Sequence, residues 1–276
     1  MLLINSLLRY CKIYSSILEE IVVEDLSGKT ILVTGASKGI GSEIVRVIGK
    51  NGANVIAHYG QDLQGAQTAT KEIPDTRKLL VKADLADPDG YRKLWQTSVN
   101  WQGKIDVLVL NAAIMPEAAI TDSLDSWSNS WHKAIAVNAT APAFLLREAV
   151  IHFLANGGGN LIGLSSWAAQ RGSGNPNLGS YAASKSVIPA LIKTVARAYA
   201  KNEIFAYLIA PGIVRTAMSE ASAKSLGGED AVTATLAMGE WVPPKEIANL
   251  VAFLSTGKNK QMTGATFDIN GATYIR

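Results

Sequence analysis

The chain has 276 residues, of which 48% are apolar and 18% charged, and its formal net charge is +3. These values are typical of a single globular α/β domain, and its interspersed acids and bases form no basic stripe of the kind that binds nucleic acid. The single cysteine excludes an intramolecular disulfide and fits a reducing, cytoplasmic compartment. Three scattered histidines and no Cys/His cluster argue against a metal site.

Residues 1–25 form an N-terminal extension with an apolar face. Arg9 and Lys12 interrupt this face well short of the roughly 20 apolar residues that a membrane span needs, so we expect no transmembrane helix here. The extension can be a helix docked on the body or on a partner subunit, or a segment without a role. Because the first acid is Glu19, an organelle-targeting signal within residues 1–18 remains an alternative to the cytoplasmic location. We expect residues 26–276 to form one domain.

From Gly28 onward, short apolar or β-branched runs alternate with helical stretches. Most of these runs are apolar on both faces, as in buried parallel strands. Helices fill the gaps, so right-handed crossovers predict an α/β fold with a Rossmann-like, doubly wound parallel sheet. The seven expected strands are Thr30–Thr34, Asn54–His58, Lys78–Lys82, Asp106–Leu110, Asn160–Leu164, Ile204–Ile209 and Thr266–Ile269.

A glycine turn, Thr34–Gly41, follows the first expected strand and opens a helix. Gly35 lets the chain leave the strand sharply, Gly39 lets backbone N–H groups approach a pyrophosphate, and Gly41 lets the helix pack on the sheet. The helix N-terminus adds a partial positive charge for the phosphates. Glycines of a turn can also serve packing alone, but this strand and helix context predicts a dinucleotide site.

The charges near the second expected strand bear on the choice of cofactor. Dinucleotide folds that prefer NAD usually end this strand with an acid, and residues 57–61 contain none. Lys38 lies in the glycine turn, where the 2′-phosphate of NADP would sit, although it can also be a solvated loop lysine. The sequence therefore favours NADP(H), and Asp62 keeps NAD(H) as an alternative.

Tyr181 and Lys185 are four residues apart in an expected helix, so their side chains share one face. An ammonium beside a phenol favours the phenolate, and we expect Lys185 to lower the pKa of Tyr181 towards neutral pH. Such a tyrosine can donate or accept a proton in carbonyl reduction. The alternative is an exposed pair with no role.

The order of these motifs resembles the short-chain dehydrogenase/reductase family, in its single-domain branch, and especially 3-oxoacyl-ACP reductase-like members. The resemblance covers Leu26 to Arg276. The glycine spacing is G-x-x-x-G-x-G, as in that family. The other matching landmarks, in order, are Asp84-Leu85, Asn111-Ala112-Ala113, Asn138, Ser165-Ser166, Tyr181 with Lys185, and Pro211-Gly212.

The resemblance implies a catalytic group of four residues. Ser166 would polarise the substrate carbonyl and Tyr181 would supply the proton. Lys185 would keep Tyr181 acidic and bind the nicotinamide ribose. Asn138, in an expected helix, would hold a water next to Lys185.

The spacing between the family's serine and tyrosine is two residues longer here than usual. We expect the insertion to lie in the loop Gln170–Gly179. If the register were off by one residue, Ser165 would take the role of Ser166.

The resemblance also implies which residues contact the cofactor. Asp84 can alternatively serve as a turn-forming aspartate, and Asn111 can bind main-chain groups as a supporting residue. The implied cofactor-binding residues are Gly35, Ser37, Lys38, Gly39, Ile40, Gly41, Tyr59, Asp84, Leu85, Asn111, Ala112, Tyr181, Lys185, Pro211, Gly212 and Val214.

On the substrate side, we expect Ser166, Trp167 and Tyr181 beside an apolar pocket, with Met115 and Pro116 also lining it. The stretch Gly212–Val242 is rich in Ala, Ser and Gly, and we expect an irregular loop that covers the substrate, as in the resembling family.

The implied activity is NADPH-dependent reduction of a ketone to a secondary alcohol, or the reverse oxidation. The substrate stays open among 3-oxoacyl thioesters, cyclic ketones, steroids and quinones. A non-catalytic, nucleotide-sensing protein of the same fold is the alternative, although such proteins usually lose the Tyr or the Lys. A hydrolase is disfavoured because residues 163–167 lack the closing glycine of a nucleophile elbow. The resemblance also implies a homodimer or homotetramer, because the helices after Asp125 and Ser180 commonly form the subunit contacts in related folds.

Overall fold

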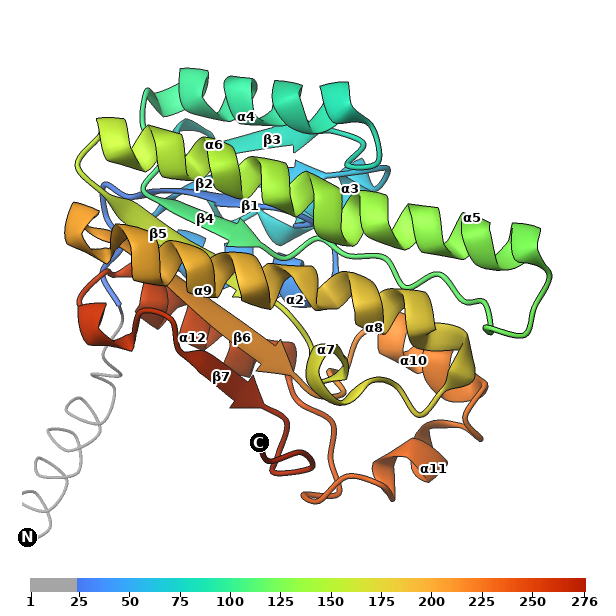
Figure 1. Cartoon of the computed structure of the whole chain (residues 1–276). Helices are drawn as coiled ribbons and strands as arrows, with labels where there is room; N and C mark the ends of the chain where they lie inside the picture. The colour runs from blue at the N-terminus through green and yellow to red at the C-terminus, as the bar shows by residue number, and fades with distance from the viewer. Residues whose placement is uncertain (1–23) are drawn as a thin grey trace, which may run out of the picture.

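The computed structural model describes residues 24–276, and the expectations for residues 1–23 lie outside this range. In the described part, helices cover both faces of one parallel sheet (Figure 1). The strands are β1 (Thr30–Val33), β2 (Asn54–Tyr59), β3 (Lys78–Lys82), β4 (Val107–Leu110), β5 (Gly159–Leu164), β6 (Ile204–Pro211) and β7 (Thr266–Ile269). All seven predicted strands are confirmed, with ends shifted by at most about two residues, the usual uncertainty of element ends.

The strand order is β3-β2-β1-β4-β5-β6-β7, and every neighbouring pair is parallel. The chain therefore winds outward from β1 to one edge, returns to β4 and continues to the other edge. This is the doubly wound, Rossmann-like sheet that the alternation of runs predicts. The reversal between β1 and β4 leaves a crevice at the carboxyl ends of these two strands.

The helices divide between the two faces of the sheet (Figure 1). One face carries α4 (Pro88–Gln102), α6 (Ala141–Ala155) and α9 (Val187–Tyr199), and the other carries α2 (Gly39–Lys50) and α12 (Pro244–Ser255). Each layer buries its own apolar cluster against the strands, which supplies the main stabilisation of the fold. The remaining α-helices are α3 (Leu63–Ala69), α5 (Leu124–Ile135), α7 (Ala168–Arg171), α8 (Gly179–Lys185), α10 (Ala217–Lys224) and α11 (Glu229–Thr233).

A continuous helical segment, Leu124–Ala155, joins α5 to α6 through the π-helical turn η2 (Ala136–Thr140). Its 32 residues are long and apolar enough to cross a bilayer by length and composition. Half of its most apolar window is nevertheless buried inside the fold, where α6 lies along the sheet (Figure 1). Core helices of soluble proteins have the same properties, so this segment is only weak support for a membrane span.

The stretch Gly212–Val242 differs from the irregular loop that its composition predicts, because it contains α10 and α11. Its two ends are joined by a bridge in which Val242 N–H donates to Ile213 O at 2.9 Å and Arg215 N–H donates to Val242 O at 3.0 Å. A small apolar cluster around the buried Trp241 fills its interior. Helices this short contain too few apolar residues to show a helical period. The stretch, called the flap below, is therefore a folded unit.

Candidate functional site

A cleft of about 510 Å³ opens at the carboxyl ends of the strands, where the strand order reverses. Open α/β sheets bind ligands at this position. The glycine turn, the ends of β3, β4 and β5, helix α8 and the start of the flap all line the cleft. Of the sequence-predicted site residues, Gly35, Ser37, Lys38, Gly39, Ile40, Asp84, Leu85, Asn111, Ala112, Ser166, Tyr181, Lys185, Pro211, Gly212 and Val214 line it.

The glycine turn is too tight for side chains at two of its positions. Gly35 has a φ of +71°, and a Cβ there would lie 2.8 Å from Ala112 Cα. A Cβ on Gly41, the closing glycine, would lie 2.0 Å from Gly35 O. The two glycines therefore permit the close packing of β1, the turn and α2 that a dinucleotide site requires.

Helix α2 begins directly after Lys38 and has no acid in its first turn. Its N-terminal partial positive charge is thus not offset by its own side chains. Asn111 holds the turn from β4, because its Nδ2 donates to Thr34 O at 2.9 Å and to Gly35 O at 3.0 Å. This arrangement can hold the pyrophosphate of a dinucleotide, and Asn111 has the supporting contacts expected of it.

The charged residues near the end of β2 differ in their surroundings. Lys38 is exposed at the rim of the cleft. The Asp62 carboxylate accepts Gly65 N–H at 2.7 Å and so caps α3. Tyr59 is buried and does not line the cleft, although its neighbours His58 and Gly60 do, and its expected role in cofactor binding stays a prediction. Lys38 is therefore a positive charge at this rim, and Asp62, the acid that follows β2 in sequence, is already engaged in capping α3.

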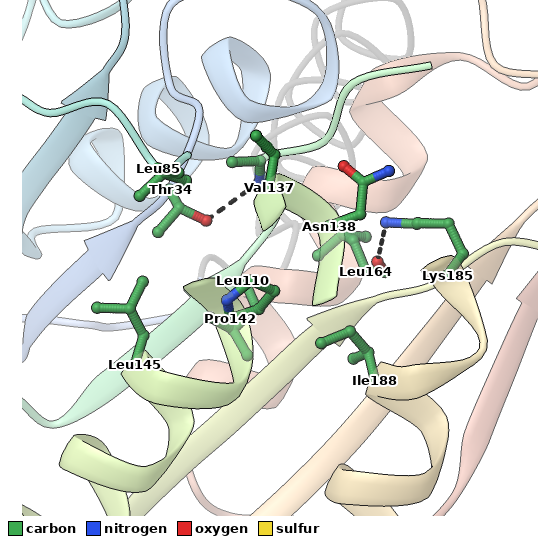
Figure 2. Close-up of a pocket in the computed structure, with 11 residues that line it drawn as sticks. Thr34, Leu85, Leu110, Val137, Asn138, Pro142, Leu145, Leu164, Lys185 and Ile188 are labelled. Atoms are coloured by element: carbon green, nitrogen blue, oxygen red, sulfur yellow. Dashed lines mark hydrogen bonds between the residues drawn. The ribbon is translucent and has the colours of Figure 1, made fainter. Parts of the chain in front are cut away.

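Tyr181 and Lys185 lie in α8, and both line the cleft. The expected lowering of the tyrosine pKa is wrong for this arrangement. Burial raises the pKa of Tyr181, although a hydrogen bond with Ser166 acts in the opposite direction. The physical reason is that loss of water dominates at the phenol. Lys185 Nζ donates to the backbone carbonyl of Leu164 at 2.6 Å (Figure 2).

The same loss of water acts on the lysine. Burial lowers the pKa of Lys185 from its usual 10.5 to about 8. Its ammonium can therefore release a proton near neutral pH, which an exposed lysine does not do.

Asn138 lies in the π-helical turn η2 and does not line the main cleft. Its Oδ1 accepts Ile114 N–H at 2.8 Å, and its Nδ2 donates to Ile114 O at 2.8 Å and to Ser184 Oγ at 2.9 Å. Ser184 Oγ in turn donates to Tyr181 O at 2.8 Å. The amide is thus fully used in joining the loop after β4 to α8, and π-helical turns often occur at functional sites.

A second, small cavity lies beside Asn138 and Lys185 (Figure 2). Its volume is about 10 Å³, roughly the space that one water molecule needs. Thr34, Val137 and Leu164 also line it. The expected water beside Lys185 therefore has a place here, without a contact from the Asn138 amide, whose hydrogen bonds are already made.

The two adjacent serines have different neighbours. Ser166 lines the cleft, accepts Ala168 N–H at 3.1 Å and makes the hydrogen bond with Tyr181. Ser165 Oγ instead donates to the backbone carbonyl of Lys185 at 3.2 Å. This geometry favours Ser166 over Ser165 as the serine beside the phenol.

The expected insertion, Gln170–Gly179, contains the end of α7, the 3₁₀ turn η3 (Pro176–Leu178) and the start of α8. Asn177 O accepts Ala118 N–H at 3.0 Å, so the insertion packs on the loop after β4. Trp167 packs against the flap cluster, with the Arg171 guanidinium 4.3 Å from its ring centre. The lining of the cleft does not include Trp167, Met115 or Pro116, and their expected position beside the substrate stays a prediction.

Several lining residues were missed by sequence reasoning, namely His58, Ile114, Thr216, Ala217, Met218 and Ser219. Thr216 caps α10 by accepting Ser219 N–H at 3.3 Å, and it touches the glycine turn, since a Cβ on Gly39 would lie 3.2 Å from Thr216 Cγ2. A threonine just before a helical run is a start signal that could have identified it. Among residues 24–276, no three His, Cys, Asp or Glu side chains gather as metal ligands would.

Known proteins with similar sequences cover nearly the whole chain. A family model described as enoyl-(acyl carrier protein) reductase matches residues 35–272. The 3-oxoacyl-(acyl-carrier-protein) reductase FabG of Rickettsia conorii is 32% identical over 251 residues, which are 91% of this chain and 99% of the relative. The 3beta-hydroxysteroid dehydrogenase 1 of Eggerthella lenta is 32% identical over 261 residues, which are 91% and 96% of the two chains.

Solved structures agree with the sequence matches. A putative NAD(P)-dependent gluconate 5-dehydrogenase from Beutenbergia cavernae, with bound NADP, has a TM-score of 0.81 at 29% identity, over 90% of this chain and 98% of that one. A dehydrogenase/reductase from Sinorhizobium meliloti has a TM-score of 0.80 at 28% identity, over 93% and 100%.

Proposed function

Since the chain belongs to the short-chain dehydrogenase/reductase family and is an NAD(P)-dependent oxidoreductase, we propose that it reduces a ketone to a secondary alcohol with NADPH, or catalyses the reverse. The observation that supports this most directly is the placement of Ser166, Tyr181 and Lys185 in the same cleft as the glycine turn. The cleft fits the cofactor because its glycine turn has no room for a side chain at Gly35 or Gly41 and its α2 N-terminus has no acid in the first turn.

The proposed chemistry uses three side chains. NADPH, when bound, supplies the hydride to the carbonyl carbon. Ser166 and Tyr181 hydrogen-bond the carbonyl oxygen, and the partly buried phenol gives its proton to that oxygen as negative charge develops. Lys185 stabilises the resulting phenolate, and the small cavity beside it can hold the water that returns a proton. Asn138 fixes the position of α8 through Ser184.

We propose NADPH rather than NADH on the grounds of charge, and Lys38→Ala tests this choice. The variant is expected to weaken NADPH binding by about 10-fold or more, because a charge-assisted hydrogen bond to the 2′-phosphate is lost. NADH, which lacks this phosphate, should bind nearly as before. The dissociation constants of both cofactors, measured by fluorescence titration, check this result.

Lys50→Ala is the matched control, because Lys50 is an exposed lysine at the other end of the same helix. It should change neither constant. An equal loss for both cofactors in Lys38→Ala, or a wild type that prefers NADH, would show that the 2′-phosphate does not lie at Lys38.

The proposed substrate is a ketone with an apolar part, since Ile114 and Met218 line the same cleft as Ser166 and Tyr181. The relatives named as acyl-carrier-protein reductase and steroid dehydrogenase are equally identical to this chain, so their names do not choose between substrates. Oxidation of NADPH should be followed with 3-oxoacyl thioesters, cyclic ketones, steroids and quinones. A protein that binds NADPH tightly but reduces none of them would favour the nucleotide-sensing alternative.

We also propose a homodimer or homotetramer. Large apolar side chains are exposed along the long helix, with Leu124 76% and Leu154 46% exposed, and Ile151 lies near Leu154. Burying them against a second copy removes this surface from water. Light scattering is expected to give a dimer or larger species at micromolar concentration, and Ile151→Glu should shift it towards monomer. A monomeric wild type would contradict the proposal.

A further inference from the structure

His58 is a buried titratable residue that the proposed chemistry does not use. It lies at the carboxyl end of β2, is 2% exposed and lines the main cleft. Burial of an imidazole is unfavourable unless both ring nitrogens find partners. The identity of these partners shows what the ring can do.

Both ring nitrogens of His58 contact backbone groups of neighbouring strand ends. Nδ1 accepts Gly35 N–H at 3.0 Å, and Nε2 lies 3.1 Å from Ala83 O. A carbonyl oxygen only accepts, so Nε2 must carry the proton and Nδ1 must present its lone pair. Burial lowers the pKa of His58, which keeps the ring in this neutral form at neutral pH. The ring thus joins the turn after β1 to the end of β3.

The peptide groups of Gly35 are held from both sides. His58 accepts its N–H from β2, while Asn111 Nδ2 donates to its carbonyl at 3.0 Å from β4. The backbone carbonyl of His58 also accepts Ala36 N–H at 2.7 Å. Gly35 has the left-handed φ of +71°, which glycine tolerates but does not favour over other conformations. Two side chains therefore fix a turn that its own sequence leaves conformationally free.

The second partner of His58 connects it to the end of β3, which also lines the cleft. Ala83 directly precedes Asp84 and Leu85, which line the cleft at the end of β3. Gly35 N–H itself is occupied by the ring, so it cannot donate to a ligand. The N–H groups that remain for a pyrophosphate are those of the following residues at the start of α2.

We propose that His58 is a positioning residue for the dinucleotide: its Nδ1 fixes the Gly35 peptide so that the cleft is preorganised to bind the cofactor, and its contact with Ala83 O orients the ring for this role. This role rests on the proposed dinucleotide site, but it does not depend on the choice between NADPH and NADH. The pyrophosphate is common to both cofactors. Loss of His58 therefore weakens the binding of NADPH and NADH equally, whereas loss of Lys38 weakens the binding of NADPH alone.

Three variants separate the two contacts of the ring. His58→Asn places Oδ1 near the position of Nδ1 and can still accept Gly35 N–H, but it cannot reach Ala83 O. His58→Gln reaches the position of Nε2 and keeps only the Ala83 contact. His58→Ala loses both. Dissociation constants for NADPH and NADH are expected to rise about 10-fold for Ala and Gln, and to stay within about 3-fold of wild type for Asn.

A purely structural role would change stability but not this pattern. His152→Ala is the matched control, since His152 Nε2 accepts Ile105 N–H at 3.0 Å and does not line the cleft. It should lower the melting temperature while both dissociation constants remain unchanged. The kcat of each His58 variant at saturating cofactor should remain within about twofold of wild type, because the ring touches no reacting group.

The proposal is overturned if folded His58→Ala binds both cofactors as wild type does, or if Gln binds as tightly as Asn. A His58→Asn variant that cannot fold would also overturn it, since the ring would then be needed for the core rather than for the site. A loss confined to NADPH would assign the effect to the 2′-phosphate. If Lys38→Ala changes the dissociation constants of NADPH and NADH equally while the His58 variants give the expected dissociation constants, the proposed preference for NADPH is wrong and the role of His58 stands.

Discussion

Tyr181→Phe is expected to lower kcat for ketone reduction by about 100-fold or more, the usual contribution of a general acid. The substitution keeps the ring and its packing in α8 and removes only the hydroxyl that we propose as proton donor. The dissociation constant of NADPH should change little, because the phenol is assigned to the reacting oxygen. Steady-state kinetics with a good ketone substrate, together with cofactor titration, check both parts.

Tyr207→Phe is the matched control for this experiment. Tyr207 is buried, and its hydroxyl donates to Asn259 O at 3.2 Å, but it lies in β6 and does not line the cleft. Its loss should leave kcat unchanged. If Tyr181→Phe reduced a good ketone at nearly the wild-type rate, another group would be the acid.

The raised pKa of Tyr181 affects how the rates of reduction and oxidation depend on pH. Because burial raises the pKa of Tyr181, the phenol is protonated at neutral pH and ready to donate. Reduction needs this protonated form, whereas oxidation of an alcohol needs the phenolate. In the proposed mechanism, the rate of reduction should therefore fall at high pH, and the rate of oxidation should increase as pH rises.

The strands and the glycine turn could be predicted from the sequence because their signals are local. A buried parallel strand needs a short apolar run, and the turn before α2 needs glycines at fixed positions. Helix α8 places Tyr181 and Lys185 together through spacing alone. In each case the interacting residues are close in sequence, so the sequence pattern predicts their arrangement.

The rest of the site depends on contacts between distant residues. The sequence shows that Asn138 lies in a helix, but not that its amide joins Ile114 to Ser184. The pKa of Tyr181 follows from its loss of water in the fold and from its hydrogen bond with Ser166, and neither can be read from a spacing of four residues.

His58 and Thr216 show the same limit. Each reaches the glycine turn from another part of the chain, His58 from β2 and Thr216 from the flap. Their residue types are common at strand ends and helix starts, so only the folded arrangement distinguishes them. The helices of the flap were missed because their few apolar residues form a cluster only when the bridge between the two ends of the flap is made.

Lys185→Met is expected to abolish most activity and yet to stabilise the cofactor-free protein at pH 7. Lys185 is 4% exposed, and the shift of its pKa from 10.5 to about 8 corresponds to a destabilisation of about 3 kcal/mol for the buried ammonium. Methionine fills similar space without charge, although the hydrogen bond to Leu164 O, worth about 1 kcal/mol, is lost. A net gain of about 2 kcal/mol should raise the melting temperature by roughly 4–8 °C.

The pH dependence of the stability difference between Lys185→Met and wild type distinguishes the effect of removing the buried charge from an effect of packing. The folded pKa lies below the unfolded one, so between about 8 and 10.5 the unfolded chain binds the extra proton and the wild type gains stability as pH rises. The advantage of methionine is therefore full below pH 8, vanishes within this window and becomes a deficit of about 1 kcal/mol above it, because only the lost hydrogen bond remains. Denaturant unfolding of both proteins from pH 7 to 10.5 measures the difference. A methionine variant that is less stable at pH 7, or whose gain is the same at every pH, would show that the buried charge carries no such cost.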